Sequence, residues 1–202
     1  MPALLIFAAL FLAALNLPAG AAEAADVLKK APYRVVSADF VQIRRLAGMD
    51  MELRITGSMV SELDGRLRWQ VDAPVRSVTV IDREKLTHFD GETKKLSVIR
   101  QETFPWLRIL RDSLDDWLSG DKARLTRRFE VTSPRPRIVR LVPRESAQKK
   151  LFRSVELEFA EKGELITVIR IRESAGDMLE IRFSQLRRDP VLPQDVWRMP
   201  PR

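Results

Sequence analysis

The chain has 202 residues, no cysteine and a formal net charge of +7, with 45% hydrophobic and 31% charged residues. This length suits one domain with a sizeable core, and the composition excludes both a disordered chain and a protein with many membrane spans. Without cysteine there is no lipid-attachment thiol, thiolate metal ligand or cysteine nucleophile. A positive charge of this size can serve binding to nucleic acid, binding to anionic lipid headgroups, or solubility alone. Because the Arg and Lys residues are dispersed along the chain, the interpretation as solvated outer faces is favoured.

The N-terminus begins with an unbroken apolar run over residues 3–15, shorter than the roughly 20 residues of a membrane-spanning helix. Pro18 and Gly20 then break the run within a small-residue pattern of the kind that a signal peptidase cleaves. The pattern predicts a signal peptide over residues 1–21 and a mature domain over 22–202 in a bacterial-type periplasm. No Lys or Arg precedes the run, so an uncleaved anchor or an upstream start is the alternative.

The first half of the mature chain reads as a short helix followed by strands. The helix is expected from Ala22 to about Ala31, where Pro32 ends it. Apolar and polar residues then alternate with the period of half-buried strands, with turns at Asp64-Gly65 and Asp90-Gly91. The predicted strands are 35–46, 51–61, the segment from Leu67 that stops before Pro74, 77–82, 85–89 and 95–99.

At Thr103 the period changes to that of a helix. Pro105 suits a first turn, and apolar residues follow at helical spacing until Gly120, which predicts an amphipathic helix. Strands resume at 128–131, 137–142, 154–160, 165–172 and 179–186. The proline-rich tail from Asp189 is expected to be irregular, with Trp197 against the sheet.

These elements predict a mainly β (α+β) protein. About eleven antiparallel strands in one sheet must curl, which gives an unclosed β-barrel or strongly curved sheet. The amphipathic helix is expected to cover the apolar face of this half-barrel as a lid. Either side chains alone or a ligand would fill the space between them.

The residues that could carry catalysis are few. His88 is the only histidine, so neither a histidine metal cluster nor a histidine relay is available, and it is expected at an edge or on the surface. Asp115-Asp116 and the pair Glu173 and Asp177 are expected on a solvated helix face and at a hairpin end, not as a glycosidic acid–base pair. We therefore expect no catalytic site, no metal and no cofactor. The aromatic residues lie mostly on apolar faces, which disfavours nucleic-acid binding.

Apolar cargo is the remaining possibility. Met51, Met59 and Met178, with the leucines of the predicted helix, could line an adaptable apolar cavity, because methionine accommodates varied shapes. They could equally be ordinary core, and periodicity alone does not choose between the two.

Several short motifs carry a resemblance to a known family. They are Asp39-Phe40-Val41-Gln42 after the N-terminal helix, Gly57, Leu67-Arg68-Trp69 with Pro74, and the segment 117–121. Together they resemble the periplasmic outer-membrane lipoprotein carriers (LolA-like), and the last segment resembles a related subgroup, which suggests a paralogue. The resemblance implies a monomeric, non-enzymatic carrier. It would take the acyl chains of a lipoprotein or other lipid from an inner-membrane exporter to an outer-membrane acceptor.

Two positions depart from the family pattern. An Arg-Pro pair, whose arginine ties the lid shut in the family, corresponds to Leu63-Asp64 here, and an Asp-Gly pair corresponds to Asp82-Arg83. These departures favour a paralogue that carries another amphiphile, such as a glycolipid or an aryl-polyene-type lipid.

The cargo is expected between the sheet and the helical lid. The expected lining residues are Met51, Leu53, Ile55, Leu67, Trp69, Val71, Val78, Val80, Leu107, Leu110, Leu114 and Trp117. The rival hypothesis is a non-enzymatic envelope sensor, or an accessory protein for glycolipid or aryl-polyene-type lipid export, that uses the same fold to bind a protein partner. An enzyme would require His88 and the carboxylates named above to converge in a cleft.

Overall fold

The computed structural model describes residues 33–63, 65–100, 102, 117, 121–144, 146–149, 152–161 and 165–201. The predicted signal peptide and N-terminal helix lie outside these residues. So does the predicted helix of residues 105–120, apart from Trp117. Among the described residues, no helix has both the length and the apolar character that crossing a membrane requires.

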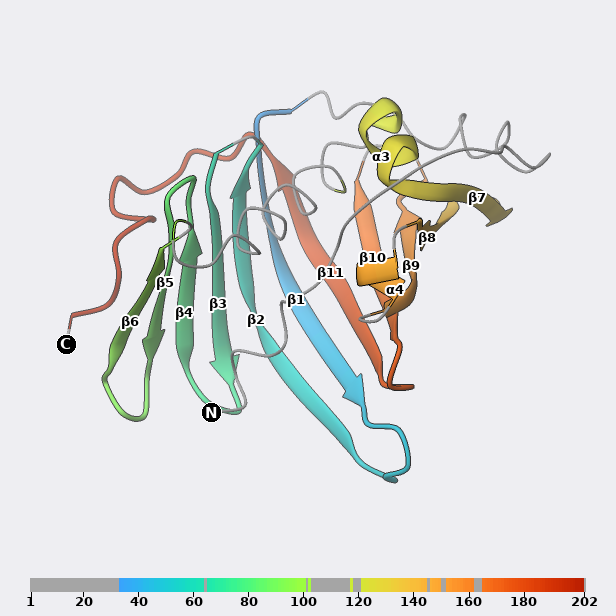
Figure 1. Ribbon diagram of the computed structural model, residues 1–202. Helices are drawn as coiled ribbons and strands as arrows, with labels where there is room; N and C mark the ends of the chain where they lie inside the picture. The colour runs from blue at the N-terminus through green and yellow to red at the C-terminus, as the bar shows by residue number, and fades with distance from the viewer. Residues whose placement is uncertain are drawn as a thin grey trace.

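The strands form one antiparallel sheet, as predicted (Figure 1). Its order is β6-β5-β4-β3-β2-β1-β11-β10-β9-β8-β7, so two meanders meet where β1 pairs with β11. The edges β6 and β7 are far apart, and the curved sheet is not closed. The strands are β1 Val35–Arg45, β2 Glu52–Glu62, β3 Leu67–Ala73, β4 Ser77–Ile81, β5 Lys85–Asp90, β6 Leu96–Arg100, β7 Phe129–Arg135, β8 Ile138–Pro143, β9 Phe152–Phe159, β10 Ile166–Glu173 and β11 Met178–Arg188.

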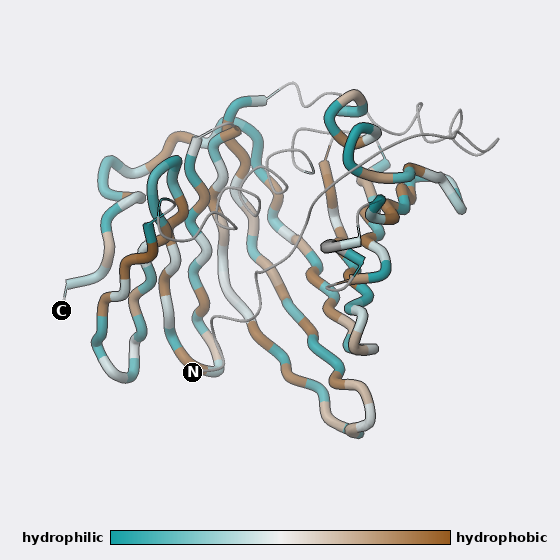
Figure 2. The backbone as a smooth tube through the Cα atoms, in the orientation of Figure 1, coloured by the Kyte–Doolittle hydropathy of each residue, from teal (hydrophilic) through white to brown (hydrophobic). Residues whose placement is uncertain are grey.

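One face of the sheet is apolar, and we call it the apolar face. Because side chains alternate along each strand, hydrophobic and hydrophilic residues also alternate along the backbone (Figure 2). The register aligns Phe40 with Gly57 and Phe183, which fixes this face across the centre of the sheet. Two clusters of buried residues lie on it, one in each meander, and both contact Ile181 and Phe183 of β11.

A short helix that the sequence analysis did not predict, α3 (Lys122–Arg128), precedes β7. Asp121 caps it, since its side chain accepts a hydrogen bond from the backbone N–H of Arg124 at 3.1 Å. Leu125 is fully buried in the cluster of the second meander, together with Phe129. A single helical turn, α4 (Ser146–Lys149), lies between β8 and β9.

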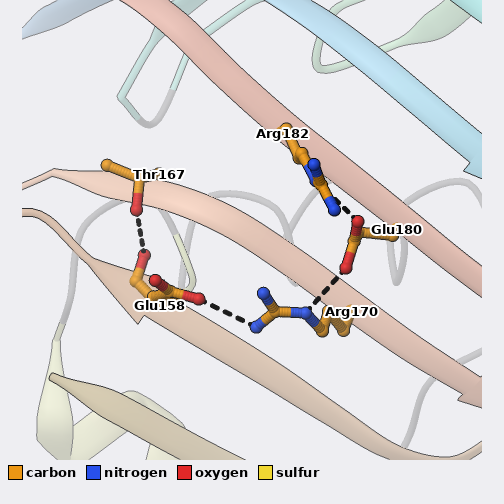
Figure 3. A network of polar contacts seen from close by, with 5 residues as sticks. All are labelled: Glu158, Thr167, Arg170, Glu180 and Arg182. Atoms are coloured by element: carbon orange, nitrogen blue, oxygen red, sulfur yellow. Dashed lines mark hydrogen bonds and ion pairs between the residues drawn. The ribbon is translucent and has the colours of Figure 1, made fainter. Parts of the chain in front are cut away.

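The opposite face of the sheet carries paired charges (Figure 3). Arg170 of β10 donates to Glu158 of β9 at 2.9 Å and to Glu180 of β11 at 2.8 Å, and Arg182 also donates to Glu180, at 2.7 Å. Burial raises the pKa of Glu180, but the hydrogen bonds from the two arginines outweigh it and lower the pKa overall. These ladders agree with the expectation that dispersed charge marks an outer face.

The tail after β11 covers part of this opposite face. Trp197 and Met199 pack against Val78, Val80 and Phe89, as predicted for Trp197. The tail is also held by charge, because Arg68 donates to the carbonyl of Arg198 at 2.9 Å and the guanidinium of Arg66 lies 4.4 Å from the centre of the Trp197 ring. The back of β3–β5 is therefore a second, smaller core.

The Trp197 contact gives a stability prediction. Trp197→Ala should lower the free energy of unfolding by about 2 kcal/mol, because it removes both apolar burial and the cation–π contact. Urea unfolding measures the change. Val191→Ala, at a fully exposed position of the same tail, is the control and should change stability by less than about 0.5 kcal/mol. Equal effects of the two substitutions would show that the Trp197 contacts add nothing to the stability of the fold.

Candidate functional site

An aromatic row lies at the centre of the apolar face. The rings of Phe40 on β1 and Trp69 on β3 stack, with centroids 3.9 Å apart and planes 23° from parallel. Phe183 on β11 meets Trp69 edge-on, with centroids 6.4 Å apart. The row therefore spans β3, β2, β1 and β11, and it joins the two meanders of the sheet.

Gly57 makes this stacking possible. It lies on β2 between the two strands that carry the rings, opposite Phe40 and Val71. A Cβ at this position would overlap the backbone carbonyl oxygen of Gln70 and would come within 2.8 Å of the Phe40 ring. Any side chain at residue 57 would push apart either the β2–β3 pairing or the aromatic pair.

Five of the predicted lining residues on β2 and β3 share the apolar face. Leu67, Trp69 and Val71 alternate along β3 and pair with Ser61, Met59 and Gly57, and Leu53 and Ile55 continue the same side of β2. Leu67 and Trp69 are buried, whereas Ile55 and Val71 are half-buried. Met59 also lies on this face and is 3% exposed.

The sequence analysis was wrong about the face of Val78 and Val80. Leu67 is paired with Ile81, and Trp69 is paired with Thr79, so the odd-numbered residues of β4 point to the apolar face. The two valines point the other way, under the C-terminal tail. The prediction assigned them to the apolar face because they are apolar. They are apolar because the C-terminal tail covers them on the opposite face.

Further predicted residues lie away from the aromatic row. Met51 and Leu53 continue the alternation of Ile55, but they are 54% and 41% exposed at the outer end of the β1–β2 hairpin. Trp117 is buried in the cluster of the second meander, with Leu125 and Phe129. Leu107, Leu110 and Leu114 lie outside the described residues. Met178 pairs with Arg45 and Arg172, on the face opposite to Leu179.

The most useful residues that the sequence analysis missed are Phe40 and Phe183 as part of the site. Phe40 was recognised as part of a motif, and Phe183 was placed in a strand only. The β1–β2 hairpin offers a signal for Phe40, because counting outward from its turn pairs Phe40 with Gly57. No local signal identifies Phe183, which reaches the row through the pairing of the first and last strands.

Polar side chains on the apolar face are few. Gln42 is 3% exposed at the centre of the sheet, and Ser61 and Thr79 are also buried. His88 is half-buried, with its Nδ1 2.9 Å from the hydroxyl of Thr79. Burial lowers the pKa of His88, although the charge of Asp90 opposes the shift. His88 lies on β5, between β4 and β6, so it is half-buried within the sheet and not on an edge strand.

At the rim of the apolar face, Arg44 binds two carboxylates. Its guanidinium lies 2.9 Å from Glu173 and 3.0 Å from Asp177, which flank the β10–β11 turn. Asp177 also accepts a hydrogen bond from the backbone N–H of Ala47 at 2.9 Å. The two carboxylates thus join the β1–β2 hairpin to the β10–β11 turn and are engaged by a cation. Among the described residues, no three His, Cys, Asp or Glu side chains are placed to hold a metal ion.

The sequence profile described as "Outer membrane lipoprotein carrier protein LolA" matches residues 32–199. The chain belongs to this LolA family. An outer-membrane lipoprotein carrier protein from Legionella pneumophila (strain Corby) is 24% identical over 169 residues, which cover 83% of this chain and 80% of the relative. The carrier protein from Pseudomonas entomophila (strain L48) is 25% identical over 171 residues, which cover 82% and 77%.

Two solved structures share the fold of this chain. An uncharacterized conserved protein from Thermus thermophilus matches with a TM-score of 0.53 at 12% identity, over 89% of this chain and 94% of that one. The complex of MucA and MucB from Pseudomonas aeruginosa matches with a TM-score of 0.51 at 14% identity, over 90% of this chain and 62% of that one. At these identities the matches are evidence of fold alone.

The close packing over Gly57 can be tested by adding one methyl group. Gly57→Ala should lower the free energy of unfolding by about 3 kcal/mol, because the new Cβ meets a backbone carbonyl that cannot move without breaking β2–β3 pairing. Gly48→Ala is the matched control. Its Cβ would meet no atom within 4 Å, so only its positive φ of 76° opposes the change, at about 1 kcal/mol. A smaller loss at Gly57 than at Gly48 would contradict the packing argument.

The Arg44 cluster predicts a pH dependence of stability. The N–H of Ala47 and then Arg44 lower the pKa of Asp177, so its stabilisation is present above the unfolded-state pKa and is lost as pH falls through the folded-state pKa. Asp177→Asn should therefore destabilise the protein by about 2 kcal/mol at pH 7 and by much less near pH 2. Urea midpoints across this range measure the difference, with Asp50→Asn on the exposed hairpin loop as control. A difference that does not change with pH would contradict the assignment.

Proposed function

We propose that this protein is a periplasmic carrier that binds the acyl chains of a lipoprotein or another amphiphilic lipid on its apolar face and moves them from the inner to the outer membrane. Membership of the LolA family and the names of the related carrier proteins support this proposal. Binding and release of a lipid need no bond to be made or broken. The proposed activity is therefore non-enzymatic and requires no cofactor.

The observation that carries the proposal is the extent of the apolar face. Its two clusters reach from Leu86 on β5 to Val131 on β7, and Ile181 and Phe183 connect them. An acyl chain gains roughly 0.8 kcal/mol for each CH₂ group that it buries, so a long apolar surface suits such a ligand. The charged ladder of Figure 3 lies on the other face, away from this surface.

The residues proposed to contact the acyl chain combine the sequence prediction with the aromatic row. Ile55, Val71 and Phe183 are half-buried and therefore partly exposed. Phe40, Met59 and Trp69 form the floor beneath them. Leu107, Leu110, Leu114 and Trp117 remain the proposed contribution of the lid.

The proposed partners follow from the same role. An inner-membrane exporter would load the carrier, and an outer-membrane acceptor would receive the lipid. The carrier would act as a monomer and would not bind nucleic acid. The replacement of the family's lid arginine by Leu63-Asp64 favours cargo other than the usual lipoproteins, such as a glycolipid or an aryl-polyene-type lipid. The open and closed states of the lid need to differ by only a few kcal/mol for the cargo to be released.

The decisive experiment is native mass spectrometry of the protein purified from a periplasmic extract without detergent, followed by organic extraction. A co-purified lipid or acylated protein is the expected result and would identify the cargo. An empty protein that also fails to bind added fatty-acid probes would contradict the proposal. It would favour the rival hypothesis of a sensor or export accessory that binds a protein partner through the same fold.

A substitution on each face separates lipid binding from general destabilisation. Val71→Glu places a charge on the apolar face and should weaken binding of a fluorescent fatty acid at least tenfold, roughly 1.4 kcal/mol, because the carboxylate would have to be buried against the acyl chain. Val98→Glu is the control on the outer face of β6, where the residue is 50% exposed. Circular dichroism verifies that both variants fold. Equal affinities of the two variants for the fatty acid would show that the apolar face is not the binding site.

A further inference from the structure

The β1–β2 hairpin ends in an exposed apolar group. Met49 is 62% exposed, Met51 54% and Leu53 41%, and they account for half of the six large exposed hydrophobic residues among those described. Figure 1 shows this hairpin extending beyond the ends of the neighbouring strands. We call residues 46–54 the hairpin end. Exposed apolar side chains are ordinary when scattered, but a group of three on one projection marks a contact surface.

The hairpin end is continuous with the apolar face. Leu53, Ile55 and Met59 occupy alternate positions on the same side of β2. Their exposure falls from 41% at Leu53, through a half-buried Ile55, to 3% at Met59 beside the aromatic row. In Figure 2, hydrophobic stretches continue along β2 towards the hairpin. An apolar strip therefore runs from the centre of the proposed lipid site to the tip of the molecule.

The hairpin end is held in place. Arg44 binds Glu173 and Asp177 of the adjacent β10–β11 segment, and Asp177 also accepts from the N–H of Ala47. These contacts hold the β1 side of the hairpin end, at Ala47, against the β10–β11 turn. A segment held in this way loses little conformational entropy when it binds.

Basic residues lie on β2 and beside the β10–β11 turn, which the N–H of Ala47 contacts through Asp177. Arg54 is exposed on β2, and exposed Arg172 lies just before the β10–β11 turn. Lys149 and Arg153 adjoin the same turn, because the carbonyl of Lys149 accepts from the Ser174 hydroxyl and Arg153 donates to the Ser174 carbonyl. Four carboxylates lie here as well: Glu52, Glu173 and Asp177 are ion-paired with Arg45 or Arg44, and Asp50 is exposed between Met49 and Met51. The six cations Arg44, Arg45, Arg54, Lys149, Arg153 and Arg172 exceed these four carboxylates by two positive charges.

We propose that the hairpin end docks on an anionic lipid bilayer, with Met49, Met51 and Leu53 entering the interface and the cations on β2 and beside the β10–β11 turn contacting the headgroups. Apolar side chains flanked by Arg and Lys have the composition of an interfacial anchor, in which apolar burial and attraction to anionic lipids add together. The apolar strip then connects the bilayer to the aromatic row. This docking goes beyond the proposed carrier function and does not require the cargo site, so the two can fail separately.

Vesicle flotation tests the docking on protein purified from the periplasm. Wild-type protein should float with vesicles of phosphatidylglycerol and phosphatidylcholine, and much less with phosphatidylcholine alone. Met49→Ser/Met51→Ser should bind the anionic vesicles about tenfold more weakly. The matched control is Val98→Ser/Val191→Ser, which removes two exposed apolar side chains elsewhere and should leave binding unchanged. Equal binding by the two double variants, or no binding by the wild type, would overturn the proposal.

A single label localises the contact. Because the chain has no cysteine, Met49→Cys provides one site for a polarity-sensitive fluorophore. Its emission should shift to the blue on addition of anionic vesicles, whereas the same label at Val98→Cys should not respond. Arg54→Gln/Arg172→Gln should reduce both binding and its salt dependence. A shift at Val98→Cys but not at Met49→Cys would place the membrane contact elsewhere and overturn the proposal.

Fatty-acid binding in solution separates this proposal from the carrier function. Met49→Ser, at a residue outside the predicted lining, should bind vesicles more weakly but a fluorescent fatty acid with unchanged affinity, because the aromatic row and Met51 are intact. Weaker vesicle binding with retained fatty-acid binding is the expected result. Vesicle binding by a wild type that takes up no fatty acid would refute the carrier and leave the docking in place. A loss of fatty-acid binding equal to the loss of vesicle binding would show that the hairpin is part of the cargo site and overturn a separate membrane contact.

Discussion

The contact on which the sheet depends is the stacking of Phe40 on Trp69 across Gly57. It joins strands that are not neighbours, and it is possible only because the strand between them lacks a side chain at that point. Phe183 extends the row into the second meander, so one group of rings ties together the two halves of the sheet. The same rings form the floor of the proposed lipid site. Stability and cargo binding are therefore linked at Gly57, and substitutions there cannot be interpreted as effects on binding alone.

Much of the fold could be predicted from the sequence because its strands are half-buried. Alternating apolar residues located all eleven strands to within a few residues, and one curved, unclosed sheet followed from their number. The prediction of which face a residue occupies failed where apolar residues in a strand had two possible explanations. Val78 and Val80 are apolar because the tail covers them, and not because they face the main core. The α3 helix was missed because it is short and has a single buried residue, Leu125, although Asp121 is a recognisable cap.

The site was harder to predict than the fold because it is assembled by register. Pairing within a hairpin can be counted from its turn, so the meeting of Phe40 with Gly57 was within reach of the sequence. The position of Phe183 depends on the pairing of β1 with β11, which no local pattern specifies. Exposure was also beyond prediction: Leu53 and Ile55 look alike in sequence, and only the length of the hairpin beyond its neighbours distinguishes an exposed residue from a half-buried one.

The strand order also dictates when the protein can finish folding. The central strand β1 is among the first described segments, yet its partner β11 is the last strand of the chain. Until β11 arrives, the first meander has an unprotected edge beside the aromatic row, a state prone to pairing with other chains. A high proportion of long-range contacts slows folding, which lengthens this exposure. The broad apolar face of the native sheet therefore comes with an aggregation-prone period while the chain is being made and folded.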